Sequence, residues 1–541
     1  MRNLSSIRKL SVFTITMDTN HSALRTPHSA LLAAVICLFY FLFLAYFSSQ
    51  HPFGTYATET DFYHLYAPDA ARLNAGQFPL NEFQGPGYPA LLSSVTKLTR
   101  DVFVAGKWIS IFSGVMCVWL TFVLFKRLFG DGSGIGAALL TLVVIELPEF
   151  SLQATTDIFF LMLFLTSIVI FTGNYFSLLP RIILAGFFTG VTYLTRYNGM
   201  ILVACFVFAI LFLNFFEKPW GERFNLAAVF LVVFFLAAMP WFIANYRHNG
   251  SPLYNANYLN MATLFYPELV GGEVTQDGTR KMGERFHSFG EVISYNPKQA
   301  FTHYVTNLFS IFWKSQRAPL VLSWIGLLGL LGVLLALFDR KSKEVKLLLL
   351  IMLGYFLLMG LNHWEERYFF FIGVCYAGLA SYLINRFAEI FSERKLLQPN
   401  PFFVRVVSGA IFFAVIWILA FVPTKKSFME FLADHPTEIP AAAKFITSQN
   451  PAPHSLKIVA RKPHLPFIAN QNWIFFPQVK SLDELKLWLE KNPVDYIAIG
   501  KRELKSRKEL TPLGDPKTAP EWLQFAWAND DPKFILYQPK H

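Results

Sequence analysis

Charged residues are scarce in this chain of 541 residues. Only 15% of its residues are charged, whereas 54% are hydrophobic and 17% are aromatic. Soluble domains carry about 25% charged residues, so the composition excludes an ordinary soluble protein and indicates a polytopic membrane protein. The net charge is +11, but much of the excess Lys and Arg lies in short connections between apolar runs. There it sets membrane topology, and no nucleic-acid partner is predicted.

The chain also lacks the residue patterns of several common sites. Its four cysteines each lie inside an apolar run, which excludes a disulfide framework and a thiolate metal site. No Gly-rich nucleotide loop occurs in the C-terminal segment, because Gly500 and Gly514 are isolated turn glycines. A nucleotide-sugar donor is therefore not expected there. No His and carboxylate spacing predicts a metal site; no cofactor is assigned, and a divalent metal ion is left open.

Long hydrophobic runs are plentiful. On the rule that about twenty apolar residues span a bilayer, the sequence predicts about eleven transmembrane helices. They are expected near residues 30–49, 102–125, 133–148, 157–174, 180–196, 199–216, 226–245, 319–338, 346–362, 369–386 and 403–422. With residues 1–29 as a cytoplasmic tail, every cytoplasmic connection carries net positive charge, as the positive-inside rule requires.

Three long segments then face away from the cytoplasm. Two are loops, at residues 50–101 and 247–317, and they belong to a transmembrane domain over 30–422. The third, residues 423–541, alternates helical and strand patterns and is predicted to form a small α/β domain. Within it, Ser481 followed by Glu484 indicates the start of a helix. The predicted fold is thus an α-helical polytopic membrane protein with a small extracytoplasmic α/β domain at its C-terminus.

One acidic, tyrosine-rich stretch stands out in the first loop, Glu59-Thr60-Asp61-Phe62-Tyr63. Ionisable residues near a bilayer are rare and commonly functional. Asp61 is the leading candidate for a general base, with Glu59 and Asp157 as further candidate acids. Tyr63, and Tyr88 in the turn Gly85-Pro86-Gly87-Tyr88-Pro89, are candidate substrate-binding residues.

Basic and polar residues lie at other helix ends on the same predicted face. The candidate binding residues among them are Arg196, Asn198, Arg247, Glu366, Arg367 and Tyr368. Arg247 can equally be an interfacial anchor, and the Glu365-Glu366-Arg367 run can be an internal ion pair. Arg196 lies in a link too short to be well solvated, which favours binding. Arginine donates two hydrogen bonds to a phosphate and keeps its charge, so a carboxylate beside arginines suits group transfer from a lipid-linked phosphate.

Taken in order along the chain, these motifs resemble a known family. The stretches are Asp61-Phe62-Tyr63, Pro86-Gly87-Tyr88-Pro89, Thr156-Asp157, Arg196-Tyr197-Asn198-Gly199, Asn245-Tyr246-Arg247 and Glu366-Arg367-Tyr368. They are similar to those of the polyprenyl-phosphate-dependent glycosyltransferases of the C superfamily, in particular bacterial relatives of the protein O-mannosyltransferases and of the lipid A aminoarabinose transferase. In that family the acidic residue of the first loop is the catalytic base, which corresponds to Asp61. The family's Asp-Glu pair is broken here by Phe62, so Glu59 and Asp157 are both candidates for the second acid.

The resemblance implies inverting transfer of one sugar from a polyprenyl-phosphate donor in a bacterial inner membrane. The acceptor would be a protein, lipid A or another glycan outside the cytoplasm. Two alternatives stay open from the residues: a polymerase or ligase of lipid-linked glycans, and a flippase-type transporter. A transporter would place its ionisable residues near the midplane, often in paired repeats, whereas these charges lie at helix ends.

Overall fold

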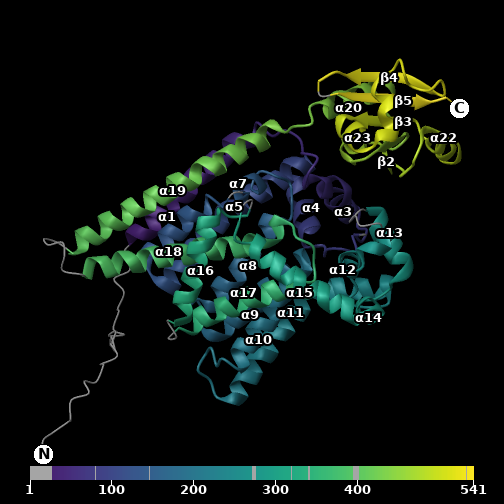
Figure 1. Ribbon diagram of the computed structural model, residues 1–541. Helices are drawn as coiled ribbons and strands as arrows, with labels where there is room; N and C mark the ends of the chain where they lie inside the picture. Colours follow the sequence, from purple (N-terminus) through teal and green to yellow (C-terminus); the bar gives the residue numbers. More distant parts are fainter. Residues whose placement is uncertain are drawn as a thin grey trace, which may run out of the picture.

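The computed structural model describes residues 27–540 apart from residues 80, 145, 271–275, 318–319, 339–341, 394–400 and 532. Helices make up most of the molecule, and a small sheet lies at one end of it (Figure 1). Five described helices are long and apolar enough to cross a membrane, at residues His28–Ser48, Val102–Phe129, Leu178–Thr195, Trp220–Asn249 and Glu366–Ile390. The protein is therefore a helical protein with several candidate membrane spans.

The helices in the predicted spanning region follow the apolar runs. Their bounds are α1 (Pro27–Ser48), α5 (Val102–Phe129), α6 (Asp131–Thr141), α7 (Leu147–Phe150), α8 (Asp157–Thr172), α9 (Leu178–Thr195), α10 (Met200–Leu211), α11 (Trp220–Asn249), α16 (Ser323–Phe338), α17 (Lys343–Met359), α18 (Phe370–Glu393) and α19 (Pro401–Ala433). Each of the eleven predicted spans falls on one of these helices. Several are shorter than 18 residues, so the number of spans stays a prediction.

Two predicted spans end elsewhere than expected. The span at 133–148 is helical only to Thr141, and a new short turn, α7, begins at Leu147 with Pro148 near its start. Proline fits a first helical turn. The last helix, in contrast, continues through Pro423 to Ala433. It therefore ends about ten residues beyond the predicted start of the C-terminal domain.

Small residues hold the central helices together. Gly329 and Gly332 of α16 lie directly against the backbone of α18, where an added Cβ at Gly332 would lie 2.3 Å from the carbonyl oxygen of Leu379. Close backbone approach at glycine is typical of helix pairs in membranes. This contact fixes α18, and with it the segment immediately before α18 that enters the site.

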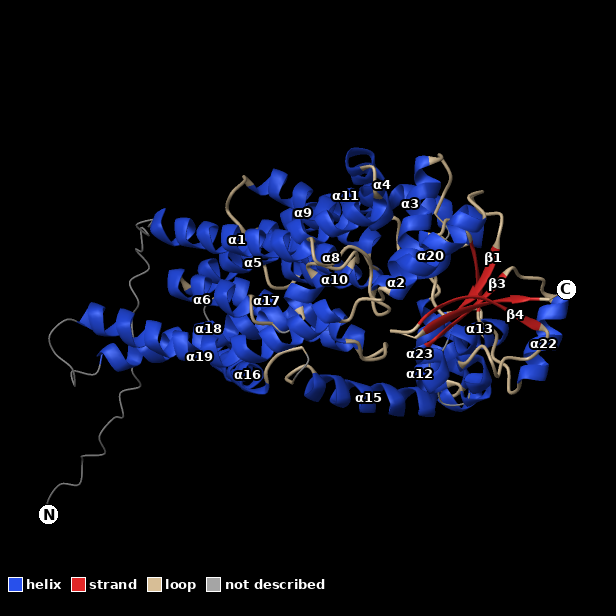
Figure 2. Cartoon of the chain, turned by 90° about the horizontal axis from the view of Figure 1, so that it is seen from above, coloured by secondary structure: helices blue, strands red, loops and turns tan. Residues whose placement is uncertain are grey.

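The two long loops are mostly helical. The first contains α2 (Glu59–Asp61), a π-helical turn (Phe62–Tyr66), α3 (Ala67–Asn74) and α4 (Gly87–Thr99). The second contains α12 (Asn257–Phe265), a 3₁₀ turn (Pro267–Val270), α13 (Gln276–Arg285), α14 (Phe289–Tyr295) and α15 (Pro297–Lys314). Both views place α3, α12 and α13 at the end of the helical bundle that also carries the C-terminal domain (Figures 1 and 2).

The C-terminal domain is a five-stranded mixed sheet with helices. Its elements are α20 (Glu438–Gln449), β1 (Lys457–Ala460), α21 (His464–Ile468), β2 (Asn472–Phe475), α22 (Leu482–Lys491), β3 (Tyr496–Gly500), α23 (Lys501–Ser506), a 3₁₀ segment (Lys508–Gly514), β4 (Leu523–Asn529) and β5 (Phe534–Pro539). The strand order is β2-β1-β3-β5-β4, parallel from β2 to β3 and antiparallel from β3 to β4. Ser481 caps α22 as predicted, accepting a hydrogen bond from the Glu484 amide. The sequence patterns had not indicated β2 and β4.

Aromatic and histidine side chains join this domain to the first loop. The Tyr63 ring lies 4.5 Å from the His464 ring and 5.0 Å from the Phe467 ring, centroid to centroid. The Nε2 atom of His464 lies 2.6 Å from the carbonyl oxygen of Thr55. The domain therefore packs on the segment that carries Asp61.

Candidate active site

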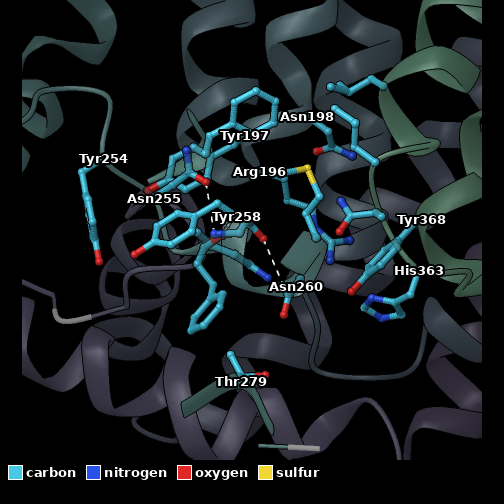
Figure 3. A pocket seen from close by; sticks show the side chains of 18 of the residues that line it. Arg196, Tyr197, Asn198, Tyr254, Asn255, Tyr258, Asn260, Thr279, His363 and Tyr368 are labelled. Atoms are coloured by element: carbon cyan, nitrogen blue, oxygen red, sulfur yellow. Dashed lines mark hydrogen bonds between the residues drawn. The ribbon is translucent and has the colours of Figure 1, made fainter. Parts of the chain in front are cut away.

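A cavity of about 890 Å³ lies where the two loops meet the helix ends. Its wall combines the link after α9, the link between α17 and α18, and residues of the second loop within 249–261 and 279–289. Figure 3 shows Arg196, Asn198, His363 and Tyr368 on one side of this cavity, and Tyr254 and Asn255 on the opposite side. The cavity thus draws on segments that are far apart in the sequence.

Two arginines and two aspartates form the charged part of this site, which we call the arginine cluster: Asp61, Asp157, Arg196, Arg367 and the ring of Tyr368. Arg367 Nη1 donates to Asp61 Oδ2 at 2.9 Å and lies 3.9 Å from Asp157 Oδ2. Arg196 donates to the other oxygen of Asp157. Asp157 therefore lies between the two guanidinium groups and holds them together.

Local backbone structure delivers each member of the cluster. Asp157 begins α8, and Arg196 follows α9 in an extended conformation that directs it away from the helix. Arg367 and Tyr368 belong to a 3₁₀ turn, Glu366–Phe369, that precedes α18. Asp61 ends α2 directly before the π-helical turn, and such turns often occur at functional sites.

The Gly-Pro-Gly turn of the first loop fixes the end of α9. An added Cβ at Gly85 would lie 2.3 Å from the carbonyl oxygen of Leu194, and one at Gly87 would lie 2.8 Å from Thr195 Oγ1. Only glycine allows such an approach. The turn thereby sets where the chain leaves α9 and presents Arg196.

Tyr368 and Glu365 complete the electrostatic environment. The ring centroid of Tyr368 lies 4.9 Å from the Cζ atom of Arg196 and 5.4 Å from that of Arg367, so one ring faces both cations. Glu365 accepts hydrogen bonds from Arg367 and His363. Burial alone opposes its ionisation, but the His363 hydrogen bond and the Arg367 charge together lower the pKa of Glu365 to about 2.

Glu59 is not part of the cavity, although only one residue separates it from Asp61. Its carboxylate is fully buried and accepts from the amides of Thr55 at 2.7 Å and Ala154 at 2.8 Å, and it lies 3.2 Å from His51 Nε2. Burial raises the pKa of Glu59, but the His51 charge and these hydrogen bonds outweigh it, so its pKa lies below the usual value. We call Glu59, His51, Thr55 and Ala154 the anchor cluster, because it ties the first loop to the chain before α8.

Other predicted site residues also lie outside the cavity. Tyr63 is buried and accepts from the Gly54 amide at 2.9 Å, and Tyr88 is buried beside Tyr66 and Phe159. Arg247 is exposed on α11, in agreement with the anchor interpretation and not among the lining residues. Glu366 accepts from Trp364 Nε1 at 2.9 Å. Of the predicted binding residues, Asp61, Arg196, Asn198, Arg367 and Tyr368 line the cavity, and Asp157 lies behind the arginines.

The structure adds lining residues that the sequence had not singled out as site residues. They are mostly neutral and polar, and include His363, Tyr254, Asn255, Asn257, Tyr258 and Asn260. For those at 254–260, the signal is a run rich in Asn and Tyr just before and within the start of α12, which is too short to separate from ordinary loop composition. Among the residues that the structure describes, no group of three or more His, Cys, Asp or Glu is arranged to hold a metal ion.

Comparisons with known proteins agree with this geometry. Residues 84–243 match the family model of the dolichyl-phosphate-mannose-protein mannosyltransferases. This segment contains the Gly-Pro-Gly turn, Asp157 and Arg196, and ends before Arg367. A search of the curated proteins finds no match.

Solved structures share the fold over nearly the whole chain. The Cupriavidus metallidurans ArnT bound to undecaprenyl phosphate is 13% identical, with a TM-score of 0.53, and the match covers 95% of this chain and 98% of that one. The Archaeoglobus fulgidus oligosaccharyltransferase in complex with zinc and sulfate is 14% identical, with a TM-score of 0.57 and coverage of 92% and 73%. The A. fulgidus oligosaccharyltransferase AglB in complex with an inhibitory peptide and a dolichol-phosphate is 12% identical, with a TM-score of 0.55. The match covers 92% of this chain and 74% of that one. The family model over residues 84–243 and the shared fold of these solved structures agree with the predicted resemblance.

Proposed function

We propose that this protein is an integral-membrane glycosyltransferase that moves a sugar from a polyprenyl-phosphate donor to an acceptor outside the cytoplasm. In this proposal it resides in a bacterial inner membrane, and its two loops and C-terminal domain are extracytoplasmic. The observation that carries the proposal is the arginine cluster at the edge of the cavity. Two arginines face one cavity from different helix ends, with a partly exposed carboxylate beside them.

The arginines are the groups that suit a lipid-linked phosphate. A guanidinium forms two parallel hydrogen bonds to phosphate oxygens. Arg196 and Arg367 are held close together by Asp157, so a single phosphate can contact both. Two fixed cations next to each other repel, and a bound phosphate reduces this repulsion. The two guanidinium groups therefore form a preorganised binding site for the negative charge of the phosphate.

Asp61 is the proposed general base. Its side chain is 33% exposed, which leaves it accessible from the cavity. In the reaction an acceptor hydroxyl oxygen bonds to the anomeric carbon of the sugar while the bond from that carbon to the phosphate oxygen breaks. The hydroxyl proton passes to Asp61, and the bonding electrons leave with the lipid phosphate, whose growing charge Arg196 and Arg367 stabilise.

The single displacement inverts the anomeric carbon, as the family resemblance implies. Glu59 is excluded from the second acid role by its burial in the anchor cluster. Asp157 is bound by Arg196 and lies near Arg367, so we assign it to positioning the arginines.

Sugar release from a panel of polyprenyl-phosphate monosaccharides tests this function. The purified protein in lipid is compared with Asp61→Asn, which keeps the side-chain shape but cannot accept the proton. We expect turnover of one donor in the wild type and a loss of about 100- to 10,000-fold in the variant. Asp101→Asn is the matched control: Asp101 lies in the same loop and caps α5 through the Val104 amide, which an asparagine also does.

Two results would contradict the proposal. Full activity of Asp61→Asn would remove Asp61 as the base. No turnover of any monosaccharide donor with acceptors supplied, together with extension or translocation of a longer lipid-linked glycan, would favour the polymerase or transporter alternatives.

A further inference from the structure

Two buried atoms in the cavity wall have no hydrogen-bond partner within the described part of the chain. They are Asn198 Oδ1 and His363 Nδ1. Both residues line the cavity, on the side of Tyr368 and Arg196 (Figure 3). Leaving a buried polar atom unpaired is destabilising, so such atoms in a cavity wall point to a ligand that supplies the missing partner.

The orientation of the Asn198 amide follows from its neighbours. The Tyr355 hydroxyl donates its proton to the carbonyl oxygen of Tyr368 at 2.6 Å. It therefore accepts from Asn198 Nδ2, which lies 3.1 Å away. The amide nitrogen is thus committed to Tyr355, and the carbonyl oxygen Oδ1 is left as an unmet acceptor.

The state of His363 follows in the same way. Glu365 is ionised, with a pKa of about 2, and an ionised carboxylate only accepts hydrogen bonds. The Nε2 atom of His363, 3.1 Å from Glu365 Oε1, therefore carries the hydrogen. When the ring carries only this hydrogen, Nδ1 is an acceptor like Asn198 Oδ1, and both unpaired atoms then call for a donor on the ligand.

The charges around these atoms select the kind of donor. Hydroxyl and ammonium groups can both donate, but an ammonium group would face Arg196 and Arg367. The two carboxylates among the described lining residues, Asp61 and Glu365, are both paired with Arg367. The opposite wall, at residues 254–260, consists of amides, tyrosines and apolar groups. A hydroxyl group satisfies both acceptors without adding charge.

We propose that Asn198 and His363 bind hydroxyl groups of the transferred sugar, and that this sugar is neutral. The inference rests on the proposed function and narrows its donor to polyprenyl-phosphate sugars without an amino or a carboxylate group. It assigns the phosphate to the arginines and the sugar hydroxyls to the two unmet acceptors beside them. Amino sugars and uronic acids are then poor donors.

The assignment of sugar hydroxyls to Asn198 and His363 is tested by a thermodynamic cycle in which both the enzyme variant and the donor are changed. The neutral donor that turns over is compared with its single-deoxy analogues, in the wild type and in Asn198→Ala. We expect Asn198→Ala to lower kcat/KM for the parent donor by about 10- to 100-fold. For one particular deoxy analogue it should cause no further loss, because the lost hydroxyl and the lost carbonyl are the same interaction.

A second variant and a control keep the cycle specific. His363→Gln keeps an N–H directed at Glu365 and removes the Nδ1 acceptor. We expect this variant, too, to cause no further loss of kcat/KM with one particular deoxy analogue. Asn249→Ala, at an exposed lining residue, should show additive effects with every analogue. A folding defect would lower turnover of all donors equally and would not produce coupling.

The outcomes separate this inference from the proposed function. Additive effects for every pairing of Asn198→Ala and His363→Gln with the analogues, or a preference for an amino-sugar donor, would overturn the inference while the glycosyltransferase activity stands. Failure of the wild type both to turn over any donor and to gain thermal stability from one would overturn both.

Discussion

The anchor cluster and the arginine cluster each take one carboxylate from the first loop, and these two residues, Glu59 and Asp61, are two positions apart in the sequence yet differ in almost every physical respect. In the anchor cluster, Glu59 is fully buried and receives hydrogen bonds from two backbone amides. In the arginine cluster, Asp61 is one-third exposed, faces the cavity and forms an ion pair with Arg367. A buried, fully bonded carboxylate stabilises a fold, whereas an accessible one can exchange a proton. A carboxylate in a loop can therefore act as a catalytic base only where a cavity gives the substrate access to it.

After Asp61→Asn, the largest loss of activity is expected at Arg367. The variant Arg367→Lys keeps the charge but loses the planar fork that contacts Asp61 and Glu365. We expect a loss of about 100-fold in kcat for sugar release, as for removal of one group that stabilises a developing oxyanion. Arg247→Lys, on the exposed part of α11, is the matched control and should remain within about twofold of the wild type. Equal losses of kcat in the two variants would show that Arg367 does not bind the phosphate.

A stability effect is expected in the anchor cluster instead. Glu59→Gln replaces one carboxylate oxygen with an N–H donor that faces a backbone amide or His51. We expect the free energy of unfolding to fall by about 3 kcal/mol, with kcat per folded molecule within about twofold of the wild type. Thermal unfolding and active-site titration of the same sample measure the two quantities. A variant as stable as the wild type would show that the cluster does not anchor the loop.

A further stability effect, of pH, is expected at the joint between the first loop and the C-terminal domain. Burial lowers the pKa of His464 from 6.5 to about 4, against the raising effect of its bond to the Thr55 carbonyl. The unfolded state binds more protons between these values, so the stabilising contribution is complete above about pH 6.5 and is lost as the pH falls toward 4.

The expected size of this loss is roughly 3 kcal/mol. Thermal unfolding of the purified protein across this pH range measures it. His464→Gln retains an N–H donor for the Thr55 carbonyl and does not titrate, so its stability should vary less over the same range. An unchanged pH dependence in this variant would assign the effect to other groups.

Much of the fold could be predicted because apolar runs of bilayer length have few alternatives. Each predicted span falls on a helix, and the strands near 456–460, 494–499 and 534–537 were placed closely. The strands β2 and β4 were missed because β2 has only four residues and β4 carries a register shift between Phe525 and Trp527. The helix α6 ends at Thr141, although the apolar run continues through Leu142, Val143 and Val144.

The site was predicted less completely, for a physical reason. Hydropathy and helix-end position identified Asp61, Arg196 and Arg367, but they cannot show which of two neighbouring side chains faces a cavity. Glu59 and Tyr63 point into packed surroundings because the helical turns over residues 59–66 send successive residues in different directions. Asn198 was predicted, but its unmet carbonyl oxygen depends on Tyr355, 157 residues away. Such a contact is set by tertiary structure alone.

The most direct test of the central claim compares Asp61→Asn with Glu59→Gln in one set of single-turnover measurements with the donor that the wild type uses. Both variants remove one carboxylate by the same chemical change, in the same loop. The account predicts that the rate of sugar release per folded molecule falls by at least about 100-fold in Asp61→Asn, while Glu59→Gln keeps nearly the wild-type rate and unfolds more readily. Equal rates per folded molecule in the two variants, or a slower rate in Glu59→Gln, would contradict the assignment of Asp61 as the base.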